Sequence, residues 1–329
     1  MPAIITHDFF GRDVYDDLFQ LIGGSKDEAD AFLLGNQGPD PLFYSVITPT
    51  VARFHTLGTR MHLDAPSELI HALKASIFEL DEHDRAIGRA YALGFICHYS
   101  LDSTMHPFVY ASQFALCDAG VHGLSREDGS EVHAIIESEF DEMVLFTKRG
   151  LTIASFNPSR EILQASERVL RIISAMYAFV ASTTYGVRVP KHLFSIAVHD
   201  FRIAQRAFRS PSGIKRSIVG AAEEIVRPYS FFRAMSHRNV ALSHSAFDNH
   251  DHAPWTCPFT GSTSTDGFWE LYDQALHVAK RNIVAFESPS FSEAEARALT
   301  GELNFSGEPA AAYITSVEPI AAKEDACSR

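Results

Sequence analysis

Three polar residues at four-residue intervals stand inside a strongly apolar segment. The segment from Tyr91 to Tyr110 contains His98, Asp102 and His106. Residues four apart on an α-helix lie on one face, about 5–6 Å apart at Cβ, so the three side chains form a polar stripe. Burying a carboxylate between two imidazoles is costly unless a positive charge pairs with it. The stripe therefore predicts a buried helix with a metal site, because imidazole nitrogen and carboxylate oxygen are good zinc ligands.

Further candidate ligands lie on either side of this segment. His133 and Glu137 are again four residues apart, in a segment with helical character. Facing helices that each contribute such pairs are how helical bundles assemble multi-metal sites, although an exposed pair would be only a helix salt bridge. Asp40 lies in a Gly-Pro-Asp-Pro turn, His62 precedes an expected helix start, and His7 lies near the first residue. Each is weak evidence alone, but together they favour one metal site.

The chain is expected to be all-α, because apolar residues recur at the helical period in several runs. These runs cover residues 66–80, 84–105, 132–146, 158–180, 190–208 and 266–286. No sustained strand alternation and no Gly/Ser/Pro linker interrupts them. We therefore expect a single helical bundle domain over residues 1–304, followed by a poorly ordered tail, 305–329, rich in Ala, Glu, Pro and Ser. Residues 243–265 form one long irregular segment, which would be either a lid beside a substrate or an ordinary loop.

Composition limits the function further. The chain of 329 residues has 28 Lys and Arg against 41 Asp and Glu, a net charge of −13, which argues against binding long nucleic acids by their backbone. It has 16 His but only 4 Cys, with no C-x-x-C pair, so we expect free thiols. The first residues lack the features of a signal peptide, and no segment approaches the roughly 20 apolar residues of a membrane span. We expect a cytoplasmic protein.

Five motifs carry a resemblance to the zinc-dependent phospholipase C family, whose fold is shared with single-strand-specific zinc nucleases. They are THDFFG (6–11), LGNQGPD (34–40), LGTRMH (57–62), GFICHYSLDSTMHP (94–107) and EVHAIIE (131–137). Their order, His, Asp, His, H-x-x-x-D, His and H-x-x-x-E, is the family's ligand order. The resemblance implies a helical bundle that holds two or three Zn²⁺ ions. It assigns the first ion to Asp40, His62, His98 and Asp102, the second to His106, His133 and Glu137, and a third to His7 with Asp102 as a bridge.

Two points of this resemblance stay open in the sequence. His55 competes with His62 as a ligand, because its distance from Asp40 is closer to that in well-known members; we prefer His62 for its Gly-x-x-x-His context. Secreted members complete the third site with an N-terminal Trp, which this chain lacks at its first residue. Asp8 or the N-terminus would then substitute, or the enzyme would use two metals.

The resemblance implies a zinc-dependent hydrolase of phosphate esters, of the phospholipase C type, with a phospholipid as the expected substrate. Asp40 is the candidate for orienting or deprotonating the attacking water. A nuclease or small-molecule phosphodiesterase on the same scaffold is one alternative, and a zinc-binding protein without turnover is another. An HD-type phosphohydrolase, suggested by His199 and Asp200, lacks a partner histidine upstream. A basic cluster would be a phosphate or lipid patch or a solvated helix face: Arg202, Arg206, Arg209, Lys215 and Arg216.

Overall fold

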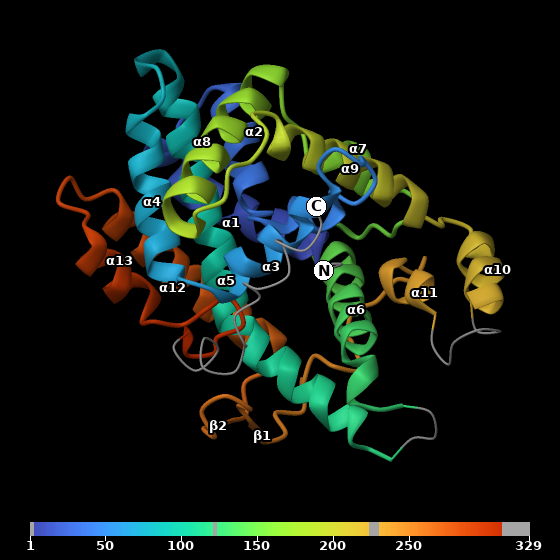
Figure 1. Cartoon of the computed structure of the whole chain (residues 1–329). Helices are drawn as coiled ribbons and strands as arrows, with labels where there is room; N and C mark the ends of the chain where they lie inside the picture. Colours follow the sequence, from blue (N-terminus) through green and yellow to red (C-terminus); the bar gives the residue numbers. More distant parts are fainter. Residues whose placement is uncertain (1–2, 121–123, 224–229, 311–329) are drawn as a thin grey trace, which may run out of the picture.

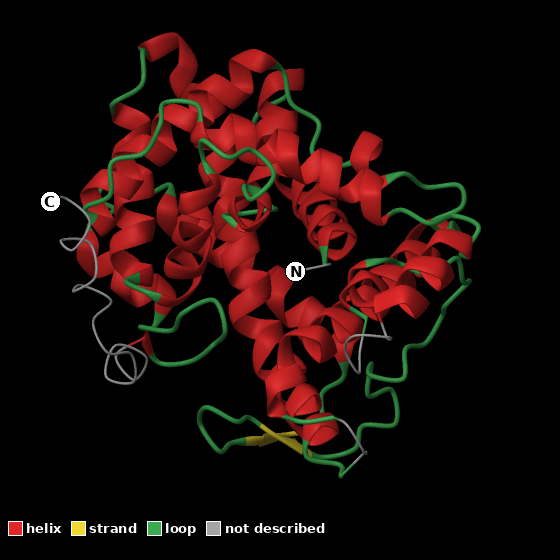
Figure 2. Ribbon diagram, turned by 45° about the vertical axis from the view of Figure 1, so that its right-hand side comes forward, coloured by secondary structure: helices red, strands yellow, loops and turns green. Residues whose placement is uncertain are grey.

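The computed structural model describes residues 3–120, 124–223 and 230–310, and their regular secondary structure is almost entirely helical (Figure 2). This confirms the all-α prediction. The elements are α1 (Ile4–Ile22), α2 (Lys26–Gly35), α3 (His55–Leu63), α4 (Pro66–Phe78), α5 (Arg85–Cys117), α6 (Gly129–Arg149), α7 (Pro158–Glu161), α8 (Glu167–Tyr185), α9 (Leu193–Phe208), α10 (Ile214–Glu223), α11 (Phe231–Met235), β1 (Trp255–Thr256), β2 (Thr263–Ser264), α12 (Phe268–Phe286) and α13 (Glu293–Thr300), with short 3-10 helices at Asp40–Tyr44, Ala52–Phe54, Glu82–Asp84 and Arg126–Asp128.

Helix α5 is the centre of the bundle. It packs against α1, α2, α4, α6, α8 and α12, and in Figure 1 it runs from the α4 and α8 end of the molecule down to the hairpin. Nearly every side chain from Tyr91 to Asp102 is buried. A helix that is enclosed on all sides must be apolar all round, which explains the composition of this segment. Its polar stripe is therefore inside the protein, as the sequence predicts.

A pair of glycines lets α2 and α5 touch through their backbones. A Cβ atom on Gly35 would lie 2.3 Å from the carbonyl oxygen of Tyr91, and one on Gly94 would lie 2.0 Å from that of Phe32. Any larger residue at either position would push the helices apart. The close crossing brings the segment that follows α2, beginning at Asn36, directly beside the polar stripe of α5.

The structure differs from the sequence prediction at the run expected to be helical from Pro158 to Val180. The helix ends at Glu161 and a new one begins at Glu167, because Leu163 adopts a φ of 58° and Ser166 caps the second helix. The carbonyl oxygen of Leu163 accepts hydrogen bonds from Arg202, which hold the break in place. Ile162 and Leu163 stay buried although they leave the helix, so the pattern of apolar residues in the sequence does not reveal the break.

The irregular segment 243–265 covers one end of α5. Its hairpin pairs Trp255 with Ser264, and the Trp255 ring lies 5.3 Å from the ring of Phe108. The predicted tail begins with residues that are packed: Phe305 is 1% exposed. The rest of that tail, 311–329, lies outside the described residues.

Three cysteines, Cys97, Cys117 and Cys257, are free thiols, as expected, and Cys327 lies outside the described residues. Within the part of the chain that the structure describes, no helix combines the length and the apolar character of a membrane span.

Candidate metal centre

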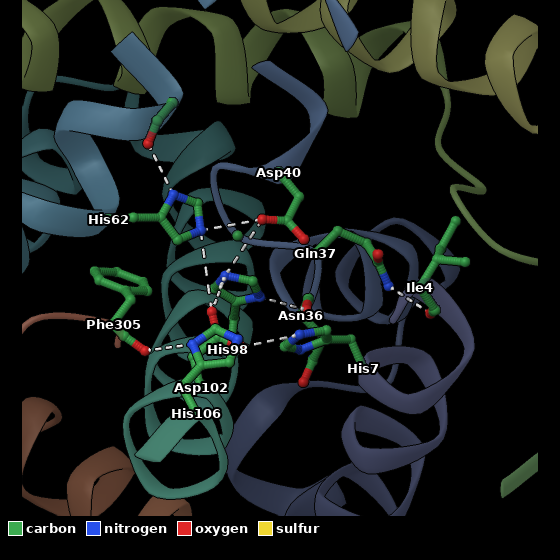
Figure 3. Close-up of polar contacts among 12 residues, drawn as sticks. Ile4, His7, Asn36, Gln37, Asp40, His62, His98, Asp102, His106 and Phe305 are labelled. Carbon is green, nitrogen blue, oxygen red and sulfur yellow. Dashed lines mark hydrogen bonds and ion pairs between the residues drawn. The ribbon is translucent and has the colours of Figure 1, made fainter. Parts of the chain in front are cut away.

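Asp102 lies at the centre of the site (Figure 3). Its Oδ1 is 3.1 Å from His7 Nε2 and 3.8 Å from His106 Nε2. Its Oδ2 is 3.2 Å from His98 Nε2 and 4.0 Å from His62 Nε2. Since Asp102 is only 3% exposed, four imidazoles from α1, α3 and α5 surround one buried carboxylate.

One group of potential ligands lies on the α3 side of Asp102. Asp40, which begins the 3-10 helix after α2, places its Oδ1 3.1 Å from His62 Nε2 and 3.8 Å from His98 Nε2. The His7 ring stacks on that of His98 at 4.4 Å. Ligand atoms of His62, His98 and Asp102 lie within 4.8 Å of one another, as do those of His7, Asp40 and His98. The arrangement therefore offers overlapping ligand sets around His98.

A second group lies between α5 and α6. His106 Nε2 and His133 Nε2 are each 3.4 Å from Glu137 Oε1. The ligand atoms of these three residues lie within 4.8 Å of one another. The four-residue spacing places His133 and Glu137 on one face of α6, and that face is turned toward α5. The structure thus brings together all eight candidate ligands of the sequence.

Four of the histidines are oriented through their Nδ1 atoms. Each Nδ1 lies within hydrogen-bond distance of an acceptor oxygen: His62 with Gly58 O at 2.7 Å, His98 with Asn36 O at 3.1 Å, His106 with Phe305 O at 2.7 Å and His133 with Gln113 Oε1 at 2.9 Å. The carbonyl oxygens can only accept, so Nδ1 carries the proton, and the lone pair of the neutral ring is on Nε2. All four Nε2 atoms point toward carboxylates, which is the usual arrangement of metal-ligating histidines.

Several buried atoms of the site lack a hydrogen-bond partner among the described residues. They are Asp40 Oδ1, Asp102 Oδ2, His62 Nε2 and His98 Nε2. Lone pairs on nitrogen and oxygen that face each other with no proton between them are unfavourable in a buried site. A cation among them would satisfy all four atoms at once, so the residues fit a metal ion.

Burial and neighbouring charges shift the pKa values of the site. Burial lowers the pKa of His98 to about 4, so its ring is neutral near pH 7, the state that binds metal. Burial also opposes the charged form of His106, but the Asp102 and Glu137 carboxylates outweigh it and raise its pKa to about 9. Burial would raise the pKa of Asp102 and Glu137, yet the surrounding histidines hold both below the usual range. Both carboxylates are therefore ionised near neutral pH.

Asp141, which was not predicted from the sequence, joins α6 to the first turn of α1 beside the site. It lies one turn after Glu137 on α6, and its Oδ1 accepts the N–H of Thr6 at 2.7 Å while its Oδ2 accepts the N–H of Ile5 at 3.1 Å. A carboxylate at a helix N-terminus satisfies free N–H groups there and stabilises the helix. Asp141 therefore fixes the first turn of α1, which carries His7. The signal was present, since Asp141 continues the four-residue spacing of the α6 pair.

The alternative residues lie elsewhere. His55 is exposed, with its Nδ1 at 2.7 Å from the carbonyl oxygen of Ala52, so the structure places His62 and not His55 in the site. Asp8 binds Arg12 at 2.6 Å. Asp200 accepts hydrogen bonds from Thr48, while the adjacent His199 is exposed, which gives no paired site of the HD type.

The basic cluster has structural contacts of its own. Arg202, Arg209 and Arg216 donate hydrogen bonds to the backbone carbonyl oxygens of Leu163, Ile153 and Ser236, respectively. These three half-buried side chains join the α9–α10 region to neighbouring segments, a structural role that differs from both the phosphate patch and the solvated helix face considered from the sequence.

The comparisons with known proteins agree with the site. The family model described as zinc dependent phospholipase C matches residues 6–182, which is more than half of the chain and includes all eight candidate ligands. No curated protein and no solved structure matches the chain. The chain belongs to the zinc-dependent phospholipase C family.

Proposed function

We propose that the protein is a zinc-dependent hydrolase of phosphate esters, and specifically a phosphodiesterase that cleaves phospholipid head groups in the manner of a phospholipase C. One observation carries the proposal: imidazole Nε2 atoms and carboxylate oxygens converge in two groups around Asp102, and buried atoms among them have no hydrogen-bond partner in the described part of the chain. Family membership supports the same reaction class.

The ligand groups suggest where zinc would bind. Asp40, His62, His98 and Asp102 would hold one ion, and the second would be held by His106, His133 and Glu137. His7, whose Nε2 is 3.1 Å from Asp102 Oδ1, would contribute to a third. Nitrogen and carboxylate oxygen ligands in sets of three or four are typical of zinc.

Bound zinc supplies Lewis acidity, which offsets the negative charge of a phosphodiester and lowers the pKa of water. The protein's own contribution is orientation. Asp40 is our candidate for orienting the attacking water or accepting its proton, since this carboxylate lies beside His62 and His98 in the first ligand group. A carboxylate within hydrogen-bond reach of the attacking water can act as its general base.

A second candidate is a zinc-binding protein without turnover, and the enclosure of the ligands favours it. The cavity beside His7, Asp102, His106 and Glu137 has a volume of about 20 Å³, and its remaining walls are mainly apolar. This is room for about one water molecule and not for a phosphodiester. Catalysis through this cavity would therefore require it to widen.

The experiment combines metal analysis with a substrate screen. The purified protein is analysed for zinc, and hydrolysis is then measured with phosphatidylcholine in micelles, a generic phosphodiester, mononucleotides and a phosphomonoester. We expect about two or three zinc ions per chain, hydrolysis of phosphodiesters, loss of activity with chelator and recovery with zinc. Zinc binding with no turnover of any of these substrates would instead establish the second candidate.

A further inference from the structure

The loop from Glu302 to Ala310, here called the 302–310 loop, contacts both ligand groups of the metal centre. The N–H of Phe305 donates to the carbonyl oxygen of His62 at 3.0 Å, and the carbonyl oxygen of Phe305 lies 2.7 Å from His106 Nδ1 (Figure 3). Its ring lies 5.0 Å from that of His62. A single residue therefore connects a histidine of each group through its main chain.

The loop has a rigid internal structure. Asn304 is fully buried, and its Oδ1 accepts the N–H groups of Ser306 at 2.9 Å and Glu308 at 3.1 Å. The N–H of Asn304 donates to the carbonyl oxygen of Glu308 at 2.9 Å, which closes the turn. Phe305 is held between these bonds, so its main-chain groups are fixed in direction before they meet the histidines.

The 302–310 loop packs against α5 at Pro107 of that helix. Pro107 has no N–H and cannot donate to the carbonyl oxygen of Ser103, so the helix surface is open at this point. Gly307 lies against it with a φ of 72°, and a Cβ atom there would be 2.7 Å from Ser103 O and 2.6 Å from Pro107 Cγ. The hydroxyl of Tyr99 anchors the start of the loop by donating to Leu303 O at 2.9 Å.

We infer that the 302–310 loop is a positioning element of the metal centre, acting through the main chain of Phe305. The carbonyl oxygen of Phe305 selects the Nδ1-protonated form of His106 and fixes the direction of its ring. The N–H of Phe305 joins the end of α3, which carries His62, to the same loop residue. This part of the chain lies outside the region that matches the family. The inference rests on the proposed function only in requiring that the centre binds zinc. Loss of such outer partners weakens metal affinity by roughly 10–100-fold.

The test compares Gly307→Ala with Gly301→Ala. Both glycines have a positive φ, 72° and 58°, so both substitutions strain the backbone, but only position 307 has neighbours within 4 Å of an added Cβ. Zinc affinity is measured by competition with a chelator, and the melting temperature of the metal-free protein is measured alongside. We expect Gly307→Ala to bind zinc roughly 10–100-fold more weakly and Gly301→Ala to bind it like the parent. A loop with a merely structural role would lower melting temperatures and leave zinc affinity unchanged.

Asn304→Ala is the second variant, and it removes the acceptor of the Ser306 and Glu308 N–H groups without introducing a clash. We expect zinc affinity to fall in the same direction by roughly 10-fold, the lower end for an outer partner. Parent-like zinc affinity in both variants would overturn the inference. Because affinity is measured without substrate, a parent that binds zinc but hydrolyses no phosphodiester contradicts the proposed function alone. A parent that binds no zinc overturns both.

Discussion

Two clusters of histidine and carboxylate side chains in this protein look alike by composition but differ in how their imidazoles are held. One is the metal centre around Asp102. The other, here called the surface cluster, consists of His244, Asp248 and His250 in the irregular segment 243–265, and its ligand atoms also lie within 4.8 Å of one another. Its two imidazole side chains are 66% and 55% exposed, whereas those in the metal centre are buried or nearly so.

The two clusters differ in which oxygen atom lies within hydrogen-bond distance of the histidine Nδ1 atoms. In the surface cluster, His250 Nδ1 lies 2.8 Å from Asp248 Oδ1, and the same carboxylate also accepts the N–H groups of Ser245 and His250. The loop therefore satisfies its own carboxylate. In the metal centre, main-chain and amide oxygens accept the Nδ1 protons of four histidines, and their Nε2 atoms are left facing Asp102 or Glu137. The closeness of histidine and carboxylate side chains is thus weak evidence for a metal site. Stronger evidence is the identity of the group that accepts the hydrogen bond from the ring nitrogen that would not bind the metal.

The largest expected difference is between Asp102→Asn and Asp248→Asn. Asp102 is near four Nε2 atoms, so its neutral amide should weaken zinc binding more than the roughly 100-fold of an outer partner and abolish hydrolysis. Asp248→Asn should leave zinc content and hydrolysis unchanged. Metal analysis and activity assays on both proteins check this, and full hydrolysis by Asp102→Asn would rule out our assignment.

A smaller difference in zinc content and activity is expected between the alanine variants of two histidines of α3, His62 and His55. His62→Ala removes one ligand of the first group, and we expect zinc content to fall by about one ion per chain, with loss of most activity. His55→Ala removes an exposed ring whose contact is with Ala52 and should behave like the parent. Equal effects of the two substitutions in zinc analysis would contradict the placement of His62 as a ligand.

The third prediction concerns Gln113, whose side-chain oxygen lies 2.9 Å from Nδ1 of the candidate ligand His133. Gln113→Leu removes the acceptor of His133 Nδ1, and we expect zinc to bind roughly 10-fold more weakly. Gln113→Glu keeps an acceptor oxygen at the same place and should retain parent-like affinity. Chelator competition separates the two variants, and an unchanged affinity in Gln113→Leu would show that this hydrogen bond does not matter for the metal.

The smallest expected effect is a pH dependence of the metal-free protein. The folded pKa of His106 is about 9, above the unfolded value of 6.5, so its stabilising contribution is complete below pH 6.5 and is lost as pH rises toward 9. His106→Gln should therefore flatten the fall in unfolding free energy over this window. The pKa of exposed His250 is also raised, through Asp248, but solvent screening makes its contribution small, so His250→Gln should retain the slope. Denaturant titrations from pH 6 to 9 in chelator check this, and an unchanged slope in His106→Gln would contradict it.

Local spacing made much of the site predictable. His98, Asp102 and His106 share one face because they are four residues apart on a helix, and the same rule paired His133 with Glu137. The helix break after Glu161 could not be predicted in this way, since the residues that leave the helix remain in the core. Contacts such as Arg202 to Leu163, which hold that break, join segments far apart in the chain.

By itself, the sequence determined the helical class, the buried polar stripe of His98, Asp102 and His106 and the pairing of His133 with Glu137, because period and spacing act over one or two turns. Only the tertiary structure decided that His62 rather than His55 joins the site and which nitrogen of each ring faces it. The physical reason is that these choices depend on oxygen atoms from other segments. The carbonyl oxygen of Asn36 reaches His98 because Gly35 and Gly94 let two helices touch, and that of Phe305 reaches His106 from almost 200 residues away.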